Sequence, residues 1–545
     1  MTAPGPADRI FFGGDVVTVD ARDSVAQAVA VRDGRIAAVG RRDDVMALAG
    51  PRTVLTDLAG RALLPGFIDA HGHLGMTGQK LACANLSPAP IGPVSRIADL
   101  QRELREQIER KGLRPGEWVV GMGYDDTAME EGRHPAREDL DSVSREHPIV
   151  TVHVSGHLMG VNTMALEMAG ISGATADPEG GHIRRRDDGE PDGVLEETAM
   201  SPLFARMPQP GPEEAAEQVR AACEYYASFG ATTAQEAALY QPSFVEACRA
   251  LEAGGRLPLD VVAYPLLIYA RAMLAAGGAE TGRFRFGGMK VHTDGSIQGY
   301  TAYLSSPYHL QPEGKSGYAG FPSFETQEKL NALVADGYEN GWQVMAHANG
   351  DAAIGMVIEA AREAEARYPG GDRRTTIIHA QTIREDQLDE AKGLGLHLSF
   401  FPGHVYYWGD RHRDIFLGPK RAARINPMRS ALDRGIPVTL HHDSPVTPPD
   451  MLTILWAAVN RVTSGGQELG PAQRLTAREA VRAVTIEAAR QIFEEDRKGS
   501  VEAGKLADLV VLSANPLTVE PMAICEITVE ETVKEGETVY ARRAR

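Results

Sequence analysis

Two histidines separated by one glycine, His71 and His73 in GFIDAHGHL (66–74), are of a type and spacing that could do chemistry. Side chains at positions i and i+2 of an extended strand point to the same face, so both imidazoles could turn toward one metal ion. Gly72 leaves room between them. The pair could equally be two polar residues where a strand meets a loop, since the chain holds 16 histidines. A metal site therefore requires ligands elsewhere in the sequence.

Further candidate ligands follow later apolar runs of the chain, one to a run. Lys290 lies in GGMKVHT, His347 in WQVMAHANG, His379 in TTIIHAQ and Asp443 in PVTLHHDS. Catalytic groups of a parallel barrel lie at the carboxyl ends of its strands, so these side chains are expected to converge. Each could be a hydrogen-bonded structural residue. Candidate ligands occur at five of the eight expected strands, however, and such a pattern is hard to explain by chance, which favours one metal site. The four cysteines have no CxxC spacing, so the ligands must be nitrogen and oxygen.

Eight short apolar runs separated by helical patterns would position these groups. Eight strand-then-helix units predict a (β/α)8 barrel. A doubly wound sheet is the alternative, because periodicity cannot show closure. The segment 476–496 is predicted as one helix with Thr476 as N-cap and Glu479 in a capping box. The predicted strands are residues 66–71, 231–236, 259–264, 287–293, 342–350, 375–381, 396–402 and 437–444.

Both ends of the chain alternate in the manner of half-buried strands. Asp33-Gly34 near the start and Glu535-Gly536 near the end are hairpin turn signals. We therefore predict one small β-sandwich domain built from residues 1–64 and 497–545, and a barrel over residues 65–496. Residues 75–229 are too many for one connection, which predicts an inserted α+β subdomain after the first barrel strand. The fold class is α/β.

Composition excludes several classes of function. The formal net charge is −18 without a long basic run, so a nucleic acid partner is not expected. The apolar runs are shorter than the roughly 18 residues of a membrane span, and the start lacks a signal-peptide pattern, so we expect a cytoplasmic protein without a membrane partner. No strand is followed by GxGxxG or GxxxxGK, which argues against a nucleotide-binding protein. The substrate is expected to be a small molecule that is not strongly anionic.

The chain resembles the amidohydrolase superfamily over nearly its whole length, in GSVEAGKLADLVVL (499–512) as well as in the histidines, the lysine and the aspartate above. Its large insertion resembles that of amidohydrolase family 3, the YtcJ-like branch. Within this branch four longer strings resemble N-substituted formamide deformylases. They are GYDDT (123–127), SGHLMGVNTMAL (155–166), DGSIQGYTAYL (294–304) and YYWGDRHRDIF (406–416).

This resemblance implies a set of metal ligands. His71 and His73 would bind one ion, His347 and His379 a second, and Asp443 would touch the first. Lys290 would be carboxylated to N6-carboxylysine and bridge both ions; a buried lysine beside a cation loses its proton, and the neutral amine can become a carbamate. An ordinary ion-pair role for Lys290, with Glu236 as the bridge, is the alternative. Zinc is expected first, as one or two ions, although these ligands also suit iron, manganese and nickel.

The expected reaction is amide hydrolysis by metal-bound hydroxide, with Asp443 as proton shuttle, releasing formate and a primary amine. Candidate substrate contacts are His157 in the insertion and the aromatic residues Tyr300, Tyr406 and Trp408, although the aromatic residues could instead pack the insertion onto the barrel. Deamination, hydrolysis of longer acyl or cyclic amides, and a non-catalytic regulatory role are the alternatives. Members of the superfamily commonly dimerise, so a homodimer is possible.

Overall fold

The computed structural model describes residues 5–154, 156, 158–178, 181–276, 282–312 and 314–543. The chain divides into two compact units. One comprises Met1–Leu74 together with Cys223–Arg545, and the other is the intervening segment Gly75–Ala222.

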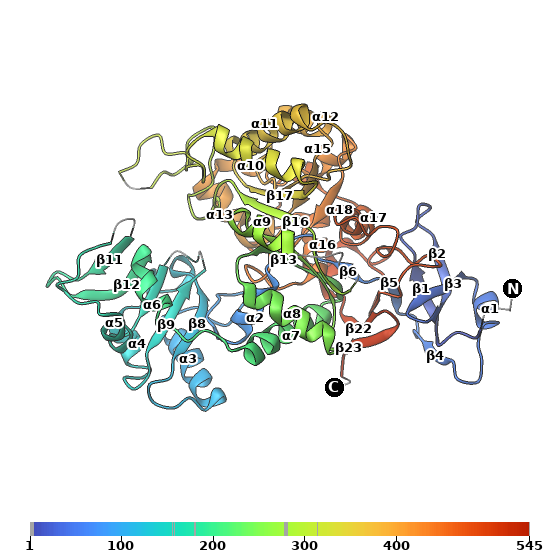
Figure 1. The fold of residues 1–545 in the computed structure, drawn as a ribbon, viewed down its shortest axis with the longest axis horizontal. Coiled ribbons are helices and arrows are strands. Elements are labelled where there is room, and N and C mark those ends of the chain that lie inside the picture. Colours follow the sequence, from blue (N-terminus) through green and yellow to red (C-terminus); the bar gives the residue numbers. More distant parts are fainter. Residues whose placement is uncertain are drawn as a thin grey trace. The chain divides into compact units, whose positions relative to one another are not determined.

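An eight-stranded sheet combines strands from both terminal segments, which are blue and red in Figure 1, and β5 of the first segment pairs with β21 of the last. Its order is β23-β22-β21-β5-β1-β2-β3, with β4 also paired to β1. Both predicted turns are confirmed: Asp33 and Gly34 have φ of 51° and 72°, and Glu535 and Gly536 have φ of 50° and 83°, as tight hairpins require. The strands are β1 (Arg9–Val17), β2 (Val25–Arg32), β3 (Arg35–Gly40), β4 (Val54–Asp57), β5 (Ala62–Pro65), β21 (Leu509–Leu512), β22 (Val529–Lys534) and β23 (Glu537–Ala541), and helix α1 spans Arg42–Met46.

Two parallel sheets of the same unit contain the strands that carry the candidate ligands. One has the order β15-β14-β13-β6 and the other β16-β17-β18-β19-β20, and all eight predicted runs contain a strand. An isolated parallel bridge between Leu266 and Lys290 lies between the sheets. The strands are β6 (Phe67–Ile68), β13 (Ala231–Leu239), β14 (Asp260–Pro265), β15 (Phe284–Phe286), β16 (Gly288–His292), β17 (Gln343–Ala348), β18 (Thr376–His379), β19 (His397–Phe400) and β20 (Val438–Leu440).

Helices alternate with these strands and cover them with apolar faces. In α11 the buried residues recur at helical spacing, among them Ile354, Val357, Ile358 and Ala361, and they join the core that includes Ile377 and Leu398 of the strands. The helices are α7 (Pro212–Ser228), which contains the division between the units, α8 (Pro242–Ala253), α9 (Leu267–Ala276), α10 (Gln327–Glu339), α11 (Asp351–Arg367), α12 (Glu385–Gly393), α13 (Gly403–Arg411), α14 (Gly418–Ala422), α15 (Met428–Asp433), α16 (Met451–Asn460), α17 (Ala477–Ala483) and α18 (Ile486–Gln491).

The prediction of one helix over residues 476–496 is wrong. Its capping box at Thr476 and Glu479 is confirmed, but the helix breaks between α17 and α18. The backbone carbonyl of Val484 accepts the N–H of Ile68 from β6 at 2.9 Å. A carbonyl bonded to a strand cannot continue the helical ladder, so the chain turns there.

The unit Gly75–Ala222 has its own six-stranded sheet in the order β11-β12-β10-β9-β8-β7. Its core includes Leu86, Leu100, Leu104, Val119 and Ile149. The strands are β7 (Ala84–Asn85), β8 (Val119–Tyr124), β9 (Ile149–His153), β10 (Leu158–Val161), β11 (Gly181–Arg185) and β12 (Pro191–Glu197), and the helices are α2 (Leu74–Leu81), α3 (Ile97–Lys111), α4 (Arg137–Asp141), α5 (Thr163–Ala169) and α6 (Ser201–Phe204).

Within the described ranges, no helix combines the length and the apolar character needed to span a bilayer.

Candidate functional site

His71 and His73 lie just beyond the first parallel strand rather than on it. The strand β6 ends at Ile68, where an extended run to residue 71 was predicted, and that part of the prediction is wrong. The side chain of Asp69 accepts the N–H of His71 at 3.1 Å, a local bond that turns the chain. The N–H of His73 then donates to the carbonyl of Ser444 at 2.7 Å, which ties the pair to the segment after β20.

Gly72 is required for this turn by close packing. A Cβ at this position would lie 2.3 Å from Asp69 Oδ2 and 2.7 Å from the Tyr226 hydroxyl. Both distances are below any real Cβ contact, so a larger residue would displace the two histidines or their neighbours.

The carboxylate of Asp443 faces both histidines. Its Oδ1 lies 3.4 Å from His71 Nε2 and 3.3 Å from His73 Nε2. Asp443 has φ of +57°, a conformation that is uncommon for a residue other than glycine and that marks a specialised turn directly after β20. These three residues form a group whose ligand atoms all lie within 4.8 Å of one another.

Lys290, in the middle of β16, enters the same cluster. Its Nζ lies 3.3 Å from His71 Nε2, and the residue is 1% exposed. Burial lowers the pKa of Lys290 to about 7, against the opposing effect of the Asp443 and Glu236 carboxylates. The neutral amine, which is the form that reacts with carbon dioxide, is therefore well populated at neutral pH.

His347 on β17 and His379 at the end of β18 lie beside these residues. Their ring centroids are 4.7 Å apart, and the His379 ring is 5.5 Å from that of His71. His347 Nε2 lies 3.1 Å from the carbonyl oxygen of Gly295, which can only accept, so this nitrogen carries the proton. Nδ1 of His347 is then the nitrogen with a lone pair.

The electrostatics of the cluster suit a cation. Burial lowers the pKa of His71, His347 and His379 well below the ordinary value, and neutral imidazole is the metal-binding form. Burial alone would raise the pKa of Asp443, but the approach of His73 outweighs it and holds this pKa well below the usual range. Oδ1 of Asp443 is buried and accepts no well-formed hydrogen bond from the described residues. Neutral nitrogen donors around an orphaned carboxylate oxygen are the donor set of zinc and related divalent ions.

Two further buried carboxylates support the ligands. Asp69 was not predicted as part of the site. Its only signal in the sequence is that it is an acidic residue two positions before His71. Its Oδ1 lies 3.3 Å from His442 Nε2. Asp294 accepts backbone N–H groups of Tyr303, Asn349 and Gly350 and lies 3.5 Å from His347 Nε2. Burial raises the pKa of both acids to about 7.

The candidate substrate residues of the first unit all pack against other aromatic rings. The ring centroid of Tyr300 lies 4.9 Å from the centroids of Tyr308 and Phe416. The ring centroid of Tyr406 lies 5.2 Å from that of Trp456. Trp408 is 6% exposed. His157 falls outside the described residues.

The segment after β19 is helical. Residues 403–411 form α13, and a π-helical turn continues it over His412–Phe416. His404 belongs to this helix and is buried, and burial lowers its pKa to about 4.

A second group of potential ligands lies in the unit Gly75–Ala222. Asp125, Asp126 and His153 have ligand atoms within 4.8 Å of one another. Asp126 accepts from His153 Nε2 at 3.0 Å, and Asp125 caps the following turn by accepting from the Thr127 backbone at 3.0 Å. These hydrogen bonds explain why the three side chains lie close together, and they fix the conformation of the GYDDT segment.

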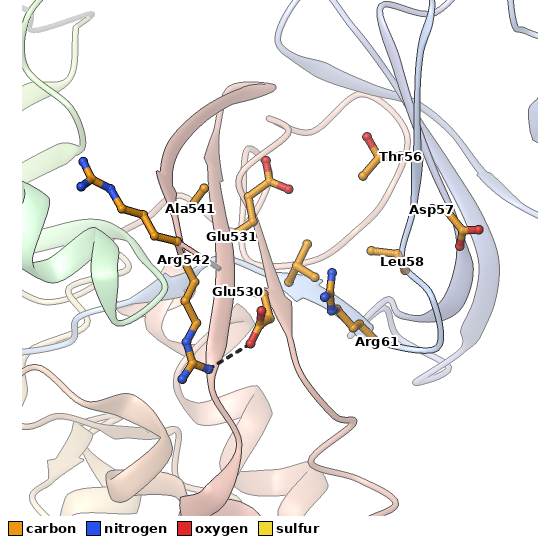
Figure 2. A pocket seen from close by; sticks show the side chains of 10 residues that line it. Thr56, Asp57, Leu58, Arg61, Glu530, Glu531, Ala541 and Arg542 are labelled. Carbon is orange, nitrogen blue, oxygen red and sulfur yellow. Dashed lines mark hydrogen bonds and ion pairs between the residues drawn. The ribbon is translucent and has the colours of Figure 1, made fainter. Parts of the chain in front are cut away.

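A cavity of about 430 Å³ lies in the terminal β-sheet, between β4 and the strands β22 and β23 (Figure 2). Its lining mixes apolar side chains such as Leu58 and Val511 with charged ones, and Arg542 pairs there with Glu530 at 3.2 Å. It includes none of the candidate ligands; the lining residues are Thr56, Asp57, Leu58, Arg61, Val511, Glu530, Glu531, Ala541, Arg542 and Arg543.

Comparison with known proteins places this architecture in a family. The sequence profile of the amidohydrolase family matches residues 54–540. The N-substituted formamide deformylase of Arthrobacter pascens is 30% identical over 551 aligned positions, covering 98% of each chain. The putative amidohydrolase YtcJ of Bacillus subtilis is 28% identical over 548 positions, covering 98% of this chain and 99% of that one.

The fold has a counterpart among solved structures. An uncharacterised metal-dependent hydrolase from Pyrococcus horikoshii superimposes with a TM-score of 0.75 at 23% identity, over 94% of this chain and 99% of that one. Since the family profile spans most of the sequence, the protein belongs to the amidohydrolase family and is a hydrolase of carbon–nitrogen bonds.

Proposed function

We propose that this hydrolase is metal-dependent and cleaves N-substituted formamides to formate and a primary amine. The observation that carries the proposal is the Asp443 carboxylate, 3.3 to 3.4 Å from Nε2 of His73 and His71, with the Lys290 amine beside them. The formamide deformylase of Arthrobacter pascens, which matches along almost the whole chain, supports the choice of substrate.

In this proposal His71, His73 and Asp443 would hold one divalent ion, zinc in the first instance. His347 and His379 would hold a second, and Lys290, carboxylated at Nζ, would supply an oxygen ligand to each. The low pKa of Lys290 supports the carbamate, because the amine must lose its proton before it can bond to carbon dioxide. Glu236, whose Oε1 lies 3.9 Å from His73 Nδ1, is the alternative bridge.

Bound metal would supply Lewis acidity and lower the pKa of water to roughly 7. The chain's own contribution is proton transfer. Asp443, held as a carboxylate by its low pKa, accepts a proton from the attacking water as the new carbon–oxygen bond forms. It then delivers that proton to the nitrogen as the carbon–nitrogen bond breaks, so that the amine leaves neutral.

We also propose that the two parallel sheets close into one (β/α)8 barrel. The parallel bridge between Leu266 and Lys290 supports closure on one side, and the hydrogen bond from His73 N to Ser444 O supports it on the other. The termini, residues 1–64 and 497–545, would form the β-sandwich domain, and residues 75–229 would be the insertion in a barrel of residues 65–496.

Tyr300, Tyr406 and Trp408 are assigned in this proposal to the recognition of an apolar N-substituent, and His157 is kept as a further candidate substrate contact. A homodimer is part of the same proposal and is checked by light scattering of the purified protein.

A panel of three compounds tests the reaction: N-benzylformamide, N-benzylacetamide and an aminated heterocycle. We expect formate release from the first alone, loss of this activity after chelation, and its return with Zn²⁺. Hydrolysis of the acetamide, or release of ammonia from the heterocycle, would replace the proposal with another amidohydrolase reaction. Activity on no compound by a metal-loaded protein would favour the non-catalytic alternative.

A further inference from the structure

A buried chain of three side chains leads from the candidate site into the sheet. His379 Nδ1 lies 3.1 Å from His441 Nε2, and His441 Nδ1 lies 2.9 Å from the hydroxyl of Ser399. Ser399 and His441 are fully buried, and His379 is 2% exposed. We call these residues the Ser399–His441–His379 chain.

Three adjacent strands hold this chain in place. His379 ends β18, Ser399 lies in β19, and His441 directly follows β20. The backbone N–H of His441 donates to the carbonyl of Phe400 at 3.0 Å, and the ring of Phe401 stacks on the His441 ring at 5.5 Å. The imidazole of His441 therefore has a fixed position and little freedom to rotate.

The hydrogen-bond direction along the chain decides whether His379 can bind a metal. An imidazole that coordinates through Nε2 must carry its proton on Nδ1. The proton on His379 Nδ1 needs an acceptor, and His441 Nε2 is in place for it. His441 then carries its own proton on Nδ1, where the Ser399 oxygen accepts it. The opposite direction would leave a proton on the coordinating nitrogen of His379.

We propose that His441 is a positioning residue which, with Ser399, fixes His379 in the tautomer and orientation that present Nε2 to a divalent metal ion. The inference rests on the proposed function, since it takes His379 as a ligand. Partners that orient metal-binding histidines in this way are worth on the order of 10–100-fold in metal affinity.

Metal affinity tests this inference without recourse to turnover. The full chain, stripped by chelation, is titrated with Zn²⁺ in competition with a chromophoric chelator, and thermal unfolding of each stripped variant checks that it folds. His441→Phe keeps the ring and its stacking on Phe401 but removes the acceptor, so we expect zinc affinity to fall on the order of 10–100-fold. His441→Gln places an amide oxygen near the former Nε2 and should retain most of the affinity.

Two further variants separate positioning from general damage to the core. Ser399→Ala removes the acceptor for His441 Nδ1 and should weaken zinc binding less than His441→Phe. His397, the buried first residue of β19, is the matched control at the other end of the same strand, and His397→Gln should leave zinc affinity unchanged.

Wild-type affinity in both His441→Phe and Ser399→Ala would overturn the inference, as would equal losses in His441→Phe and His441→Gln. A wild-type chain that binds no Zn²⁺ would overturn both the inference and the proposed function. A chain that binds Zn²⁺ with the expected order of affinities, yet releases no formate, would remove the proposed reaction alone.

Discussion

The Asp443 carboxylate lies 3.3 Å from Nε2 of His73 and 3.4 Å from Nε2 of His71, although almost the entire fold separates these residues in the sequence. The turn at Asp69 and Gly72 presents the two histidines, and the turn after β20 presents the aspartate. The contacts of Asp443 Oδ1 with the two histidines therefore require two segments that are distant in the sequence to fold against each other.

Substitution of Asp443 by Asn tests its role as proton shuttle. The amide cannot accept the proton of the attacking water, so formate release should fall by about 10²–10⁴-fold while most of the metal stays bound. Formate is measured enzymatically and metal by atomic emission. Asp433→Asn, at the exposed end of α15, is the control and should keep wild-type turnover. Near-wild-type activity of Asp443→Asn would refute the assignment.

Carboxylation of Lys290 should depend on pH. Its pKa of about 7 means that the amine is mostly protonated and inert below this value and mostly neutral above it. The carbamate signal in carbon-13 spectra with labelled bicarbonate should therefore grow as pH rises from about 6 to 8. Lys290→Met, which cannot form a carbamate, should show no such signal. A signal of equal size in this variant would assign the carbamate to another amine.

Gly72→Ala should damage the site through packing alone. The new Cβ must move Asp69 or Tyr226, which costs about 1–3 kcal/mol of unfolding free energy and shifts His71 and His73. Urea unfolding and zinc titration measure the two effects. Gly40→Ala is the matched control, because a Cβ at Gly40 meets no atom within 4 Å. If Gly72→Ala retained wild-type zinc affinity, the turn could not be what positions the two histidines.

Asp260 should be a strong contributor to stability, because it lies between two buried lysines. Its Oδ2 is 2.9 Å from Lys534 Nζ and also pairs with Lys498. In Asp260→Asn, Lys534 keeps Asp508 and Lys498 keeps Glu494 as a partner. Each ammonium group loses one charged hydrogen-bond partner, so we expect a loss of about 1.5–3 kcal/mol in urea unfolding at pH 7. Asp336→Asn, which breaks an ion pair with the exposed Arg271, is the control and should cost little.

The same carboxylate gives a pH dependence with a definite sign. Burial would raise the pKa of Asp260, but the two lysines outweigh it and hold this pKa well below the usual range. Its stabilisation is therefore fully present above the unfolded pKa of about 3.9 and is lost as pH falls toward the folded value. The difference in unfolding free energy between wild type and Asp260→Asn should shrink over that acidic range. A constant difference would show that Asp260 acts through packing.

Patterns along the sequence were sufficient for elements that local forces decide. The hairpin at Asp33-Gly34 and the capping box at Thr476 depend on residues only a few positions apart, and each is found where it was predicted. Each of the eight apolar runs likewise contains a strand, since burial on both faces demands continuous apolar sequence.

The sequence by itself determined the family, the strands and the types of residue available for chemistry. Only the tertiary structure decided that β6 stops at Ile68, that the helix after Thr476 breaks at Val484, and that His441 reaches His379. The ends of β6 and of α17 share one cause, a backbone hydrogen bond between the two segments. The N–H of Ile68 donates to the carbonyl of Val484. In the third case, two side chains meet because β18, β19 and β20 are neighbours. Such choices depend on which segments meet in space, which periodicity along one segment does not encode.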